Sequence, residues 1–461
     1  MKENYDVIIV GAGPAGIFAA YELCLRDPKL QVLLLDKGKT IEQRVHPKQG
    51  EKRSITTGFG GAGAFSDGKF NITEEFGGWL QDYLSNEKVL ELIKYVDSIY
   101  IKFGAPHEIT NPYTDEVRDI ERKGYGVGLK LLRANVRHLG TEVNTTIMKN
   151  ISDYMAKIMD IQMSTEVKDV IVDHETCTGV ILKDGTKIYG KNVIIVPGRE
   201  GSVWLEGVLK PKGIAFVNNQ VDMGVRVETN DVIMEKINKS LYEGKFVYRS
   251  SCGLVVRTFC SNPSGHVVIE NAHDGIKLVN GHSYRDPKLG STNTNFALLV
   301  SHEFSEPFNE PNEFASEIAL LANKLANDSV IVQKYGDIIK GRRTNAKRLA
   351  EGFVTPTLKT ATPGDLGLIL PYNTMKSIIE MLEALDHITP GIANEHTLLY
   401  GVEAKFYSAR PQTNGHFETA IHHLYIGGDG AGVTRGLAQA GANGVYIASC
   451  ILKGKVGVSN D

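Results

Sequence analysis

The sequence predicts an α/β protein in which a Rossmann-like parallel sheet, with helices and a small antiparallel layer, is interrupted by an inserted α+β domain. Three observations lead to this prediction. A strand, glycine turn and helix open the chain at residues 6–25, a similar motif closes it at residues 424–440, and strand patterns dominate between residues 211 and 394.

The opening motif has the pattern of a dinucleotide-binding turn. A buried strand, 6–10, leads into Gly11-Ala12-Gly13-Pro14-Ala15-Gly16 and then into a helical stretch, and Asp36 ends a second strand at 32–35. The first glycine permits the turn, the second lets a pyrophosphate approach, and the third lets the helix pack on the strand. We therefore predict a dinucleotide site, with a tight glycine turn that binds nothing as the alternative.

Composition limits the classes of function. With 461 residues the chain has room for two or three domains, and its formal net charge of −3 indicates no global preference for nucleic acid or anionic membrane. No apolar stretch is long enough to span a bilayer and no signal peptide is evident, so we expect a cytoplasmic protein. The five cysteines form no CxxC pair, which argues against a metal site and favours reduced thiols.

A second glycine-rich segment, residues 55–69, follows the first two strands. Its apolar side chains, such as Phe59 and Phe65, are unusual for a solvated linker. We interpret it as a loop that wraps closely around a flat ligand, with Ser66, Asp67 and Lys69 as polar contacts. A flexible surface loop is the alternative.

Helices are expected next. One begins near Asn86, with Ser85 as its N-cap, and ends at Gly104. A second is expected over residues 129–139, and a third has an apolar face over residues 147–158.

Strand patterns then take over. We expect one strand over residues 161–173 and a hairpin of residues 179–182 and 186–189 that turns at Asp184-Gly185. A buried strand at 192–196 follows and ends at Pro197-Gly198, where the chain can pass close to a bound dinucleotide.

Alternating apolar residues predict a second domain of strands. They lie at 221–227, 246–259 and 266–270, and helical faces lie at 318–325 and 375–385. The basic run at 340–348 is interpreted as a solvated face, with an anion site as the alternative.

The closing motif resembles the opening one in its strand, glycine turn and acid. Leu424-Tyr425-Ile426 leads to Gly428 and Asp429, and a helix is expected from about Gly436. The last strand is therefore expected to return to the first domain. We predict a discontinuous domain of residues 1–210 and 395–461, with residues 211–394 inserted as a substrate domain.

Taken together, the opening motif, the strand ending at Gly198 and the closing Gly428-Asp429 resemble the glutathione-reductase-type FAD flavoproteins. The resemblance implies FAD as the cofactor, with the pyrophosphate at the opening glycines and the adenosine ribose at Asp36. It also implies that Asp429 contacts the ribityl or pyrophosphate part. The candidate cofactor-binding residues are Gly11, Ala12, Gly13, Pro14, Ala15, Gly16, Asp36, Lys37, Arg44, Gly60, Gly61, Gly63, Ser66, Asp67, Val167, Gly198, Gly428, Asp429, Arg435, Gly436 and Leu437.

More narrowly, the chain resembles a bacterial group known only as FAD-dependent dehydrogenases. The segments that carry this resemblance are Asp36-Lys37-Gly38 with Arg44, Gly60 to Lys69, Gly198 to Ser202, Asn280 to Ser283, Pro363 to Leu366 and Gly401 to Glu403. The chain departs from the group at two positions. It has Asn262 where a second cysteine follows Cys260, and Lys405 in place of an arginine, which removes bidentate geometry toward a carboxylate.

The sequence contains no second GxGxxG after a strand, so no separate NAD(P)H domain is predicted. Hydride then comes from the small-molecule substrate, from transiently bound NAD(P)H or from an electron-transfer partner. The helix after Gly436, with Arg435, would place positive potential beside a reduced flavin. The candidate substrate-side residues are Lys69, Asn280, Ser283, Arg285, Glu403, Lys405 and Arg410, each of which could equally be structural.

The leading hypothesis is an FAD-dependent oxidoreductase that transfers hydride between flavin N5 and a small organic substrate. A flavin monooxygenase that uses NAD(P)H and oxygen is the alternative within enzymes. A non-catalytic binding or escort protein on the same fold, as in GDP-dissociation inhibitors, is the alternative from another class.

Overall fold

The computed structural model describes residues 2–51, 54–66, 68–272, 275–284 and 286–455. The chain forms two compact units. Unit 1 consists of Met1–Thr110, Ala134–Asn218 and Ser408–Asp461, and unit 2 of Asn111–Arg133 and Asn219–Tyr407.

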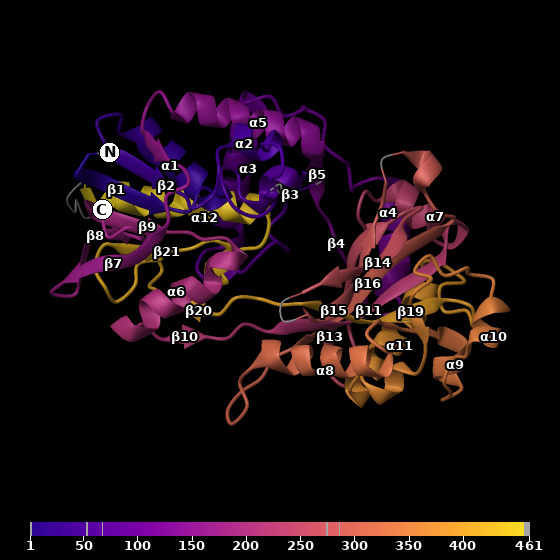
Figure 1. The fold of residues 1–461 in the computed structure, drawn as a ribbon. Helices are drawn as coiled ribbons and strands as arrows, with labels where there is room; N and C mark the ends of the chain where they lie inside the picture. Colours follow the sequence, from indigo (N-terminus) through magenta and orange to yellow (C-terminus); the bar gives the residue numbers. More distant parts are fainter. Residues whose placement is uncertain (1, 52–53, 67, 273–274, 285, 456–461) are drawn as a thin grey trace. The chain divides into compact units, whose positions relative to one another are not determined.

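Unit 1 is built on a sheet whose central strands are parallel. β1 (Asn4–Val10) lies between β2 (Val32–Leu35) and β9 (Lys187–Ile195), and β21 (Leu424–Ile426) pairs with the end of β9 (Figure 1). Val10 is in register with both Leu35 and Ile195, and Ile195 with Ile426. The strands therefore end together, and the loops that follow them share one edge of the sheet.

Further strands extend this sheet on both sides. β6 (Asp160–Gln162) pairs parallel with β2, while β8 (Thr176–Leu182) pairs antiparallel with both β9 and β7 (Val167–Asp173). The strand expected over residues 161–173 is thus two strands. The turn at Asp184-Gly185 joins β8 to β9 as predicted.

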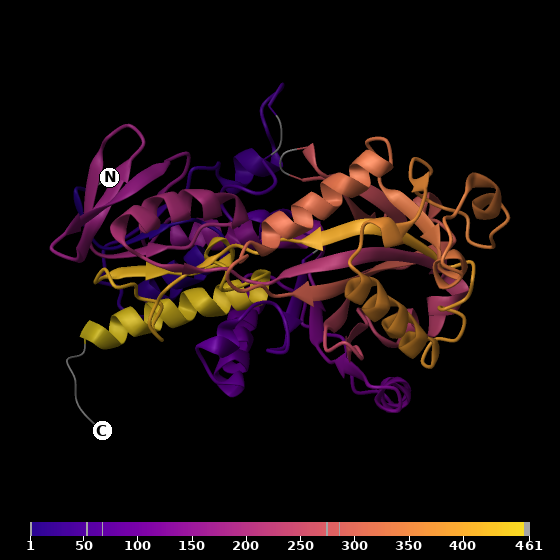
Figure 2. The same cartoon turned by 90° about the horizontal axis from the view of Figure 1, so that it is seen from below.

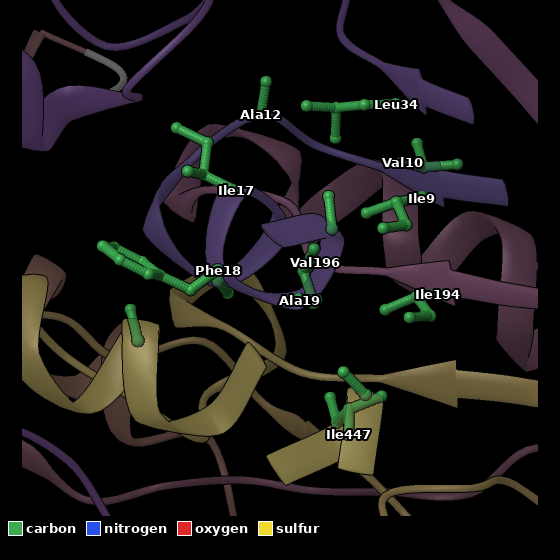
Figure 3. Packing of buried hydrophobic residues seen from close by; sticks show 14 of the residues in the cluster. Ile9, Val10, Ala12, Ile17, Phe18, Ala19, Leu34, Ile194, Val196 and Ile447 are labelled. Atoms are coloured by element: carbon green, nitrogen blue, oxygen red, sulfur yellow. The ribbon is translucent and has the colours of Figure 1, made fainter. Parts of the chain in front are cut away.

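Six helices of unit 1 contribute apolar residues to the same core as this sheet. They are α1 (Pro14–Arg26), α2 (Ile41–Val45), α3 (Asn86–Lys102), α5 (Gly140–Met155), α6 (Ser202–Leu209) and α12 (Leu437–Lys455). Figure 3 shows Ile9 and Ile194 of neighbouring strands in one cluster with Phe18 of α1 and Ile447 of α12. The Ser85 hydroxyl accepts from Lys88 N and caps α3, as the sequence predicts.

The prediction of a helix over residues 129–139 is wrong. This stretch forms β4 (Leu129–Leu132) and β5 (Asn135–His138), and β5 pairs with β3 (Lys69–Ile72). Leu129 and Leu131 are buried while the lysine between them is exposed, which is the period of a strand. Pairing with partners distant in the sequence overrides the local helical spacing.

Unit 2 is a mixed, mainly antiparallel sheet covered by helices. The strand order is β18-β17-β19-β11-β16-β13-β12-β4. The strands are β18 (Thr362–Pro363), β17 (Ile331–Lys334), β19 (Leu398–Lys405), β11 (Val221–Asn230), β16 (Asn293–His302), β13 (Val255–Asn262) and β12 (Lys245–Arg249). The helices are α4 (Asp115–Tyr125), α7 (Asp231–Ser240), α8 (Pro311–Leu325), α9 (Tyr335–Ile339), α10 (Ala346–Ala350) and α11 (Tyr372–Asp386) (Figures 1 and 2).

The two faces of this sheet differ in polarity. Val221, Met223, Val225 and Val227 of β11 enter the core beneath the helices, so the residues between them lie on the opposite face. The hairpin of β14 (His266–Asn271) and β15 (Lys277–His282) contacts the central strands. Its Val267 and Val279 form a separate small core with Tyr400 of β19.

The unit boundaries differ from the predicted domain limits of 1–210, 211–394 and 395–461. Strand β19 begins at Leu398 but pairs with β11 and β17, so it belongs to unit 2. Residues 111–133 also join unit 2, because β4 pairs with β12. The chain thus contributes two separate segments to unit 2.

Candidate functional site

The loops that follow β1, β9 and β21 meet at the carboxyl edge of the unit 1 sheet. A Cβ on Gly11 would lie 2.4 Å from the Val196 carbonyl oxygen, and a Cβ on Gly16 would lie 1.8 Å from that of Gly11. Gly11 also has a φ of +111°, which disfavours other residues. The first and third glycines of the motif are therefore required by turn geometry and helix packing.

Gly13 has a different environment. It is the N-cap of α1 and provides no side chain to the free N–H groups of the first turn. No atom lies within 4 Å of the position that its Cβ would take. The helix thus presents an open N-terminus that suits an anionic phosphate group.

Asp36 helps to shape this turn. One carboxylate oxygen accepts from Ala12 N at 2.8 Å and the other from Gly38 N at 2.7 Å, while Lys37 beside it is exposed. Each carboxylate oxygen accepts about two hydrogen bonds, so Asp36 retains capacity for a ribose hydroxyl. Val167 begins the β7 strand, and just before it Thr165 N donates to the Asp36 carbonyl.

The second glycine-rich loop packs directly on the first. Gly60 N donates to the Ala12 carbonyl at 2.8 Å, and a Cβ on Gly61 would lie 3.2 Å from Gly13 Cα. Gly63 lies against the Leu437 side chain at the start of α12. The Ser66 hydroxyl donates to the Gly63 carbonyl, while Asp67 lies outside the described residues.

Arg44 holds this loop from within. Its side chain is fully buried, and its guanidinium donates to the carbonyls of Ser54, Ile55, Phe59 and Gly61 at 2.5–3.2 Å. Burial lowers the pKa of Arg44 to about 10. The resemblance assigned Arg44 to the cofactor, but its guanidinium is bonded to four loop carbonyls. The structure therefore indicates that Arg44 positions the loop.

The closing motif completes the same edge. Gly430 N donates to the Pro197 carbonyl, next to Gly198, so the loops after β9 and β21 are in contact. The Asp429 carboxylate accepts from the Thr434 hydroxyl at 2.7 Å and from Gly436 N at 3.4 Å. Burial raises the pKa of Asp429 above its ordinary value, although the Thr434 hydrogen bond opposes this shift.

The segment of residues 76–80 also packs across the start of α12. This contact was not predicted from the sequence. Trp79 N donates to the Val433 carbonyl, and Arg435 N donates to the Gly77 carbonyl. The Gln439 side-chain amide donates to the Phe76 carbonyl. The adjacent glycines at 77 and 78 were the available signal for such a close approach.

The substrate-side candidates are divided between the units. Lys69 begins β3 opposite His138, and Arg410 in β20 (Arg410–Pro411) pairs with Asp82 at 2.5 Å; both lie in unit 1. Asn280, Ser283, Glu403 and Lys405 lie in unit 2. Arg285 lies outside the described residues.

In unit 2, the substrate-side candidates Glu403 and Lys405 lie beside a buried arginine, Arg226. Glu403 is fully buried and accepts from Arg226 Nη1 at 3.2 Å, and Lys405 Nζ lies 3.3 Å from the same carboxylate. Arg226 also donates to Asn295 Oδ1 at 2.9 Å and to the Cys260 carbonyl at 2.8 Å. Two cations therefore share one carboxylate in a desolvated cluster.

The hairpin strand β15 closes this cluster. The Asn280 amide donates to Glu270 across the hairpin, and the Ser283 hydroxyl donates to Asn262, which contacts Asn295. A Cβ on Gly281 would lie 2.0 Å from Arg226 Nη2. The glycine lets the hairpin pack on the cluster.

Two members of the cluster, Arg226 and Asn295, were missed from the sequence. The signal was the polar half of the β11 alternation, since Arg226 lies between the apolar residues that predicted the strand. The position of Glu403 required the structure. A register shift opposite Val402 lets Val402 face the helical core and sends Glu403 to the face of Arg226.

The residues that the structure describes also lack two features. No group of three or more His, Cys, Asp or Glu side chains there is placed to share a metal ion. Within the same residues, no helix has the length and apolar content needed to cross a bilayer.

Comparison with known families gives one clear match. Residues 220–406 match the family described as "FAD-dependent protein, C-terminal domain-like". The match covers most of unit 2 and includes every residue of the Arg226 cluster. The family and the unit 1 loops both indicate FAD as the cofactor.

Individual relatives are more distant. The chain is 34% identical over 105 residues to the digeranylgeranylglycerophospholipid reductase of Methanosarcina mazei, an alignment of 20% of this chain and 25% of that protein. Glycine oxidase from Bacillus cereus is 14% identical, covering 98% of this chain and 95% of that one at a TM-score of 0.38. L-proline dehydrogenase from P. horikoshii is also 14% identical. The likeness covers 98% of this chain and 95% of that one, at a TM-score of 0.40. At these scores the structural likeness carries no argument about function.

Proposed function

We propose that the protein is an FAD-dependent oxidoreductase that transfers hydride between the flavin and a small organic substrate. The observation that carries the proposal is the set of glycine-rich loops at one sheet edge, around an open helix N-terminus. Hydrogen bonds join these loops to one another, so the edge is built as one continuous surface. Such an edge is where open α/β sheets bind nucleotide cofactors.

The residues present fit FAD. In this assignment the N-terminus of α1 at Gly13 binds the pyrophosphate, and Asp36 accepts a ribose hydroxyl. Asp429 lies beside the start of α12 and remains able to accept further hydrogen bonds. When bound, FAD supplies a two-electron centre that accepts or donates hydride.

The chain's own residues provide the environment. The segments around Gly60 and Trp79 pack beside the starts of α1 and α12 and fix the position of the loops there. The N-terminus of α12 favours negative charge beside it. We assign substrate recognition to unit 2, with Lys405 as the candidate contact, because the buried pair of Arg226 and Glu403 holds its ammonium group in place.

The visible spectrum of the purified protein tests the cofactor assignment. We expect flavin absorption bands, or their appearance after incubation with FAD. A protein that takes up no FAD would contradict the proposal and favour the escort alternative.

A matched pair of variants tests where FAD binds. Gly13→Val places a side chain in the open space at the start of α1, and Gly207→Val does the same on α6, because neither glycine has an atom near its Cβ position. We expect Gly13→Val to weaken FAD binding at least about tenfold while Gly207→Val binds like wild type. Equal FAD affinity in the two variants would place the cofactor elsewhere.

The reaction is tested anaerobically. We expect a metabolite to bleach the flavin without NADH or NADPH. Reduction by a nicotinamide that depends on an added organic substrate, followed by oxygen consumption and hydroxylation, would support the monooxygenase alternative instead.

A further inference from the structure

The basic run that the sequence predicts as a solvated face forms a rigid loop at one end of unit 2. Asp337 of α9 is buried and accepts from Arg342 Nε at 2.6 Å, from the Thr344 hydroxyl at 2.7 Å and from Arg348 Nε at 3.2 Å. Gln333 donates to the Arg342 carbonyl, and Thr344 N donates to the Gly364 carbonyl. A buried carboxylate and two neighbouring strands thus fix the loop.

The segment that forms this loop is rich in positive charge. Residues 331–360 contain seven Lys and Arg but only two Asp and Glu, in a chain whose net charge is −3. Asp337 offsets one of the two arginines that it binds, and Glu395 pairs with Lys340 at 3.2 Å. Arg343 and Lys347 are exposed and add to the surplus.

Large apolar side chains project around the same loop. Phe353 is 82% exposed and stacks on His396, the neighbour of the Glu395 that pairs with Lys340. Ile339, which directly precedes Lys340, is 53% exposed. Leu368, 64% exposed, ends the short helical turn whose Leu366 N donates to Gln333 beneath the loop.

We propose that this surface, which we name the basic tip (Ile339, Lys340, Arg342, Arg343, Lys347, Phe353 and Leu368), docks peripherally on a bilayer that contains anionic phospholipid. Cations attract an anionic lipid surface, and neighbouring aromatic and aliphatic side chains insert at headgroup depth. The inference does not depend on the proposed redox function.

The arrangement favours a bilayer over an acidic protein. A stable protein interface has a contiguous, closely packed apolar centre surrounded by polar groups. In the basic tip, Phe353, Ile339 and Leu368 project from three separate segments among cations. Side chains that project singly can each enter a fluid interface without needing a complementary pocket.

Sedimentation of the full chain with vesicles tests the proposal. The probes are phosphatidylcholine vesicles with and without phosphatidylglycerol. We expect binding only to the anionic vesicles, and weaker binding at about 0.5 M salt, because exposed charges are then screened. Absence of binding to anionic vesicles at low salt would overturn the proposal.

Two variants with matched controls locate the surface. Each cation near an anionic surface contributes about fivefold to binding, so the double variant Arg343→Gln with Lys347→Gln should weaken vesicle binding about 25-fold. Lys149→Gln with Lys157→Gln, at exposed positions of unit 1, should leave it unchanged. Phe353→Ser should weaken binding about tenfold, unlike Val203→Ser at a residue of similar exposure, 80%.

The apolar variant separates insertion from binding by charge alone. If Phe353→Ser binds anionic vesicles like wild type while the charge variant does not, insertion is absent. The basic tip then binds the vesicles by charge alone, and the proposal of docking by apolar insertion is wrong. Equal binding by all variants would also overturn it, while an unchanged flavin spectrum would show that the proposed function is unaffected.

Discussion

At the scale of single residues, two buried arginines of this protein hold backbone carbonyls in place. Arg44 links four carbonyls of the glycine-rich loop, and Arg226 fixes the carbonyl of Cys260 beside its pair with Glu403. A guanidinium suits this task because its planar group directs five donors in fixed directions. Such residues affect a binding site without touching the ligand.

Replacing Arg44 by lysine tests this role. Lysine keeps the charge but has only three donors on one nitrogen, so at least one of the four carbonyls loses its partner. We expect a loss of about 1–3 kcal/mol in the free energy of unfolding and weaker FAD binding. Urea unfolding and FAD titration measure the two effects, with Lys149→Ala at an exposed position of α5 as the control. An unchanged free energy of unfolding and FAD affinity for Arg44→Lys would show that the loop keeps its conformation without the guanidinium.

Asp429 gives a prediction about pH. Burial raises the pKa of Asp429 in the folded protein above its ordinary value of 3.8, so the folded state binds this proton more tightly than the unfolded state. Stability from this group is therefore present below pH 3.8 and is lost as pH rises through the folded pKa. We expect apo Asp429→Asn to exceed wild type in Tm at neutral pH and to match it at low pH.

Thermal unfolding of the two apo proteins across this pH range measures the difference. FAD titration is the companion measurement, and we expect Asp429→Asn to bind FAD more weakly. A Tm difference that is independent of pH would contradict the assigned titration.

At the scale of elements, strand alternation and one register shift build the charged cluster of unit 2. Strand β11 sends its apolar residues to the helical core and Arg226 to the other face. The shift opposite Val402 then brings Glu403 onto that face in β19. The β14–β15 hairpin covers the cluster, and Gly281 is where the two approach most closely.

Gly281→Ala tests this packing. The new Cβ would lie 2.0 Å from Arg226 Nη2 and 2.2 Å from Asn295 Oδ1, so the hairpin or the arginine must move. We expect a loss of about 1–3 kcal/mol in the free energy of unfolding, as for other overpacked sites. Gly415→Ala, which has open space around its Cβ position, is the control in the same urea titration. Equal stability of the two variants would mean that the hairpin is loosely held.

At the scale of the whole molecule, each unit is assembled from segments far apart in the sequence. Unit 1 is closed by β21 and α12 at the end of the chain, and unit 2 receives α4 and β4 from residues 111–133. Neither unit is a continuous stretch of chain. The sheet of unit 2 has β4 as its edge strand.

A fragment of residues 219–407 tests the importance of this early segment. Without residues 111–133, β12 becomes an unpaired edge, and the core loses Val117, Ile120, Leu129 and Leu131. We expect this fragment to aggregate or to unfold at lower urea. Fusion of residues 111–133 through a flexible glycine-serine linker should restore solubility. Equal behaviour of the two fragments would show that β4 is dispensable.

Local patterns predicted much of the fold. The opening turn, the capped helix at Asn86 and the return of the last strand to the first sheet could be read from glycine spacing, capping residues and apolar runs. Residues 129–139 could not, because their helical spacing competes with strand pairing to distant partners. The extents of the units depend on the same pairing.

For this protein the sequence by itself determined the α/β class and the placement of glycines for a nucleotide cofactor, since turn geometry and close approach depend on residue type at fixed spacing. Only the tertiary structure decided that Arg44 supports the loop from within, that Glu403 meets Arg226, and that the basic run is a fixed loop among exposed apolar side chains. Arg226 and Glu403 are far apart in the sequence, and the bonds of Arg44 and Asp337 depend on the folded path of their loops, so no local pattern encodes these features.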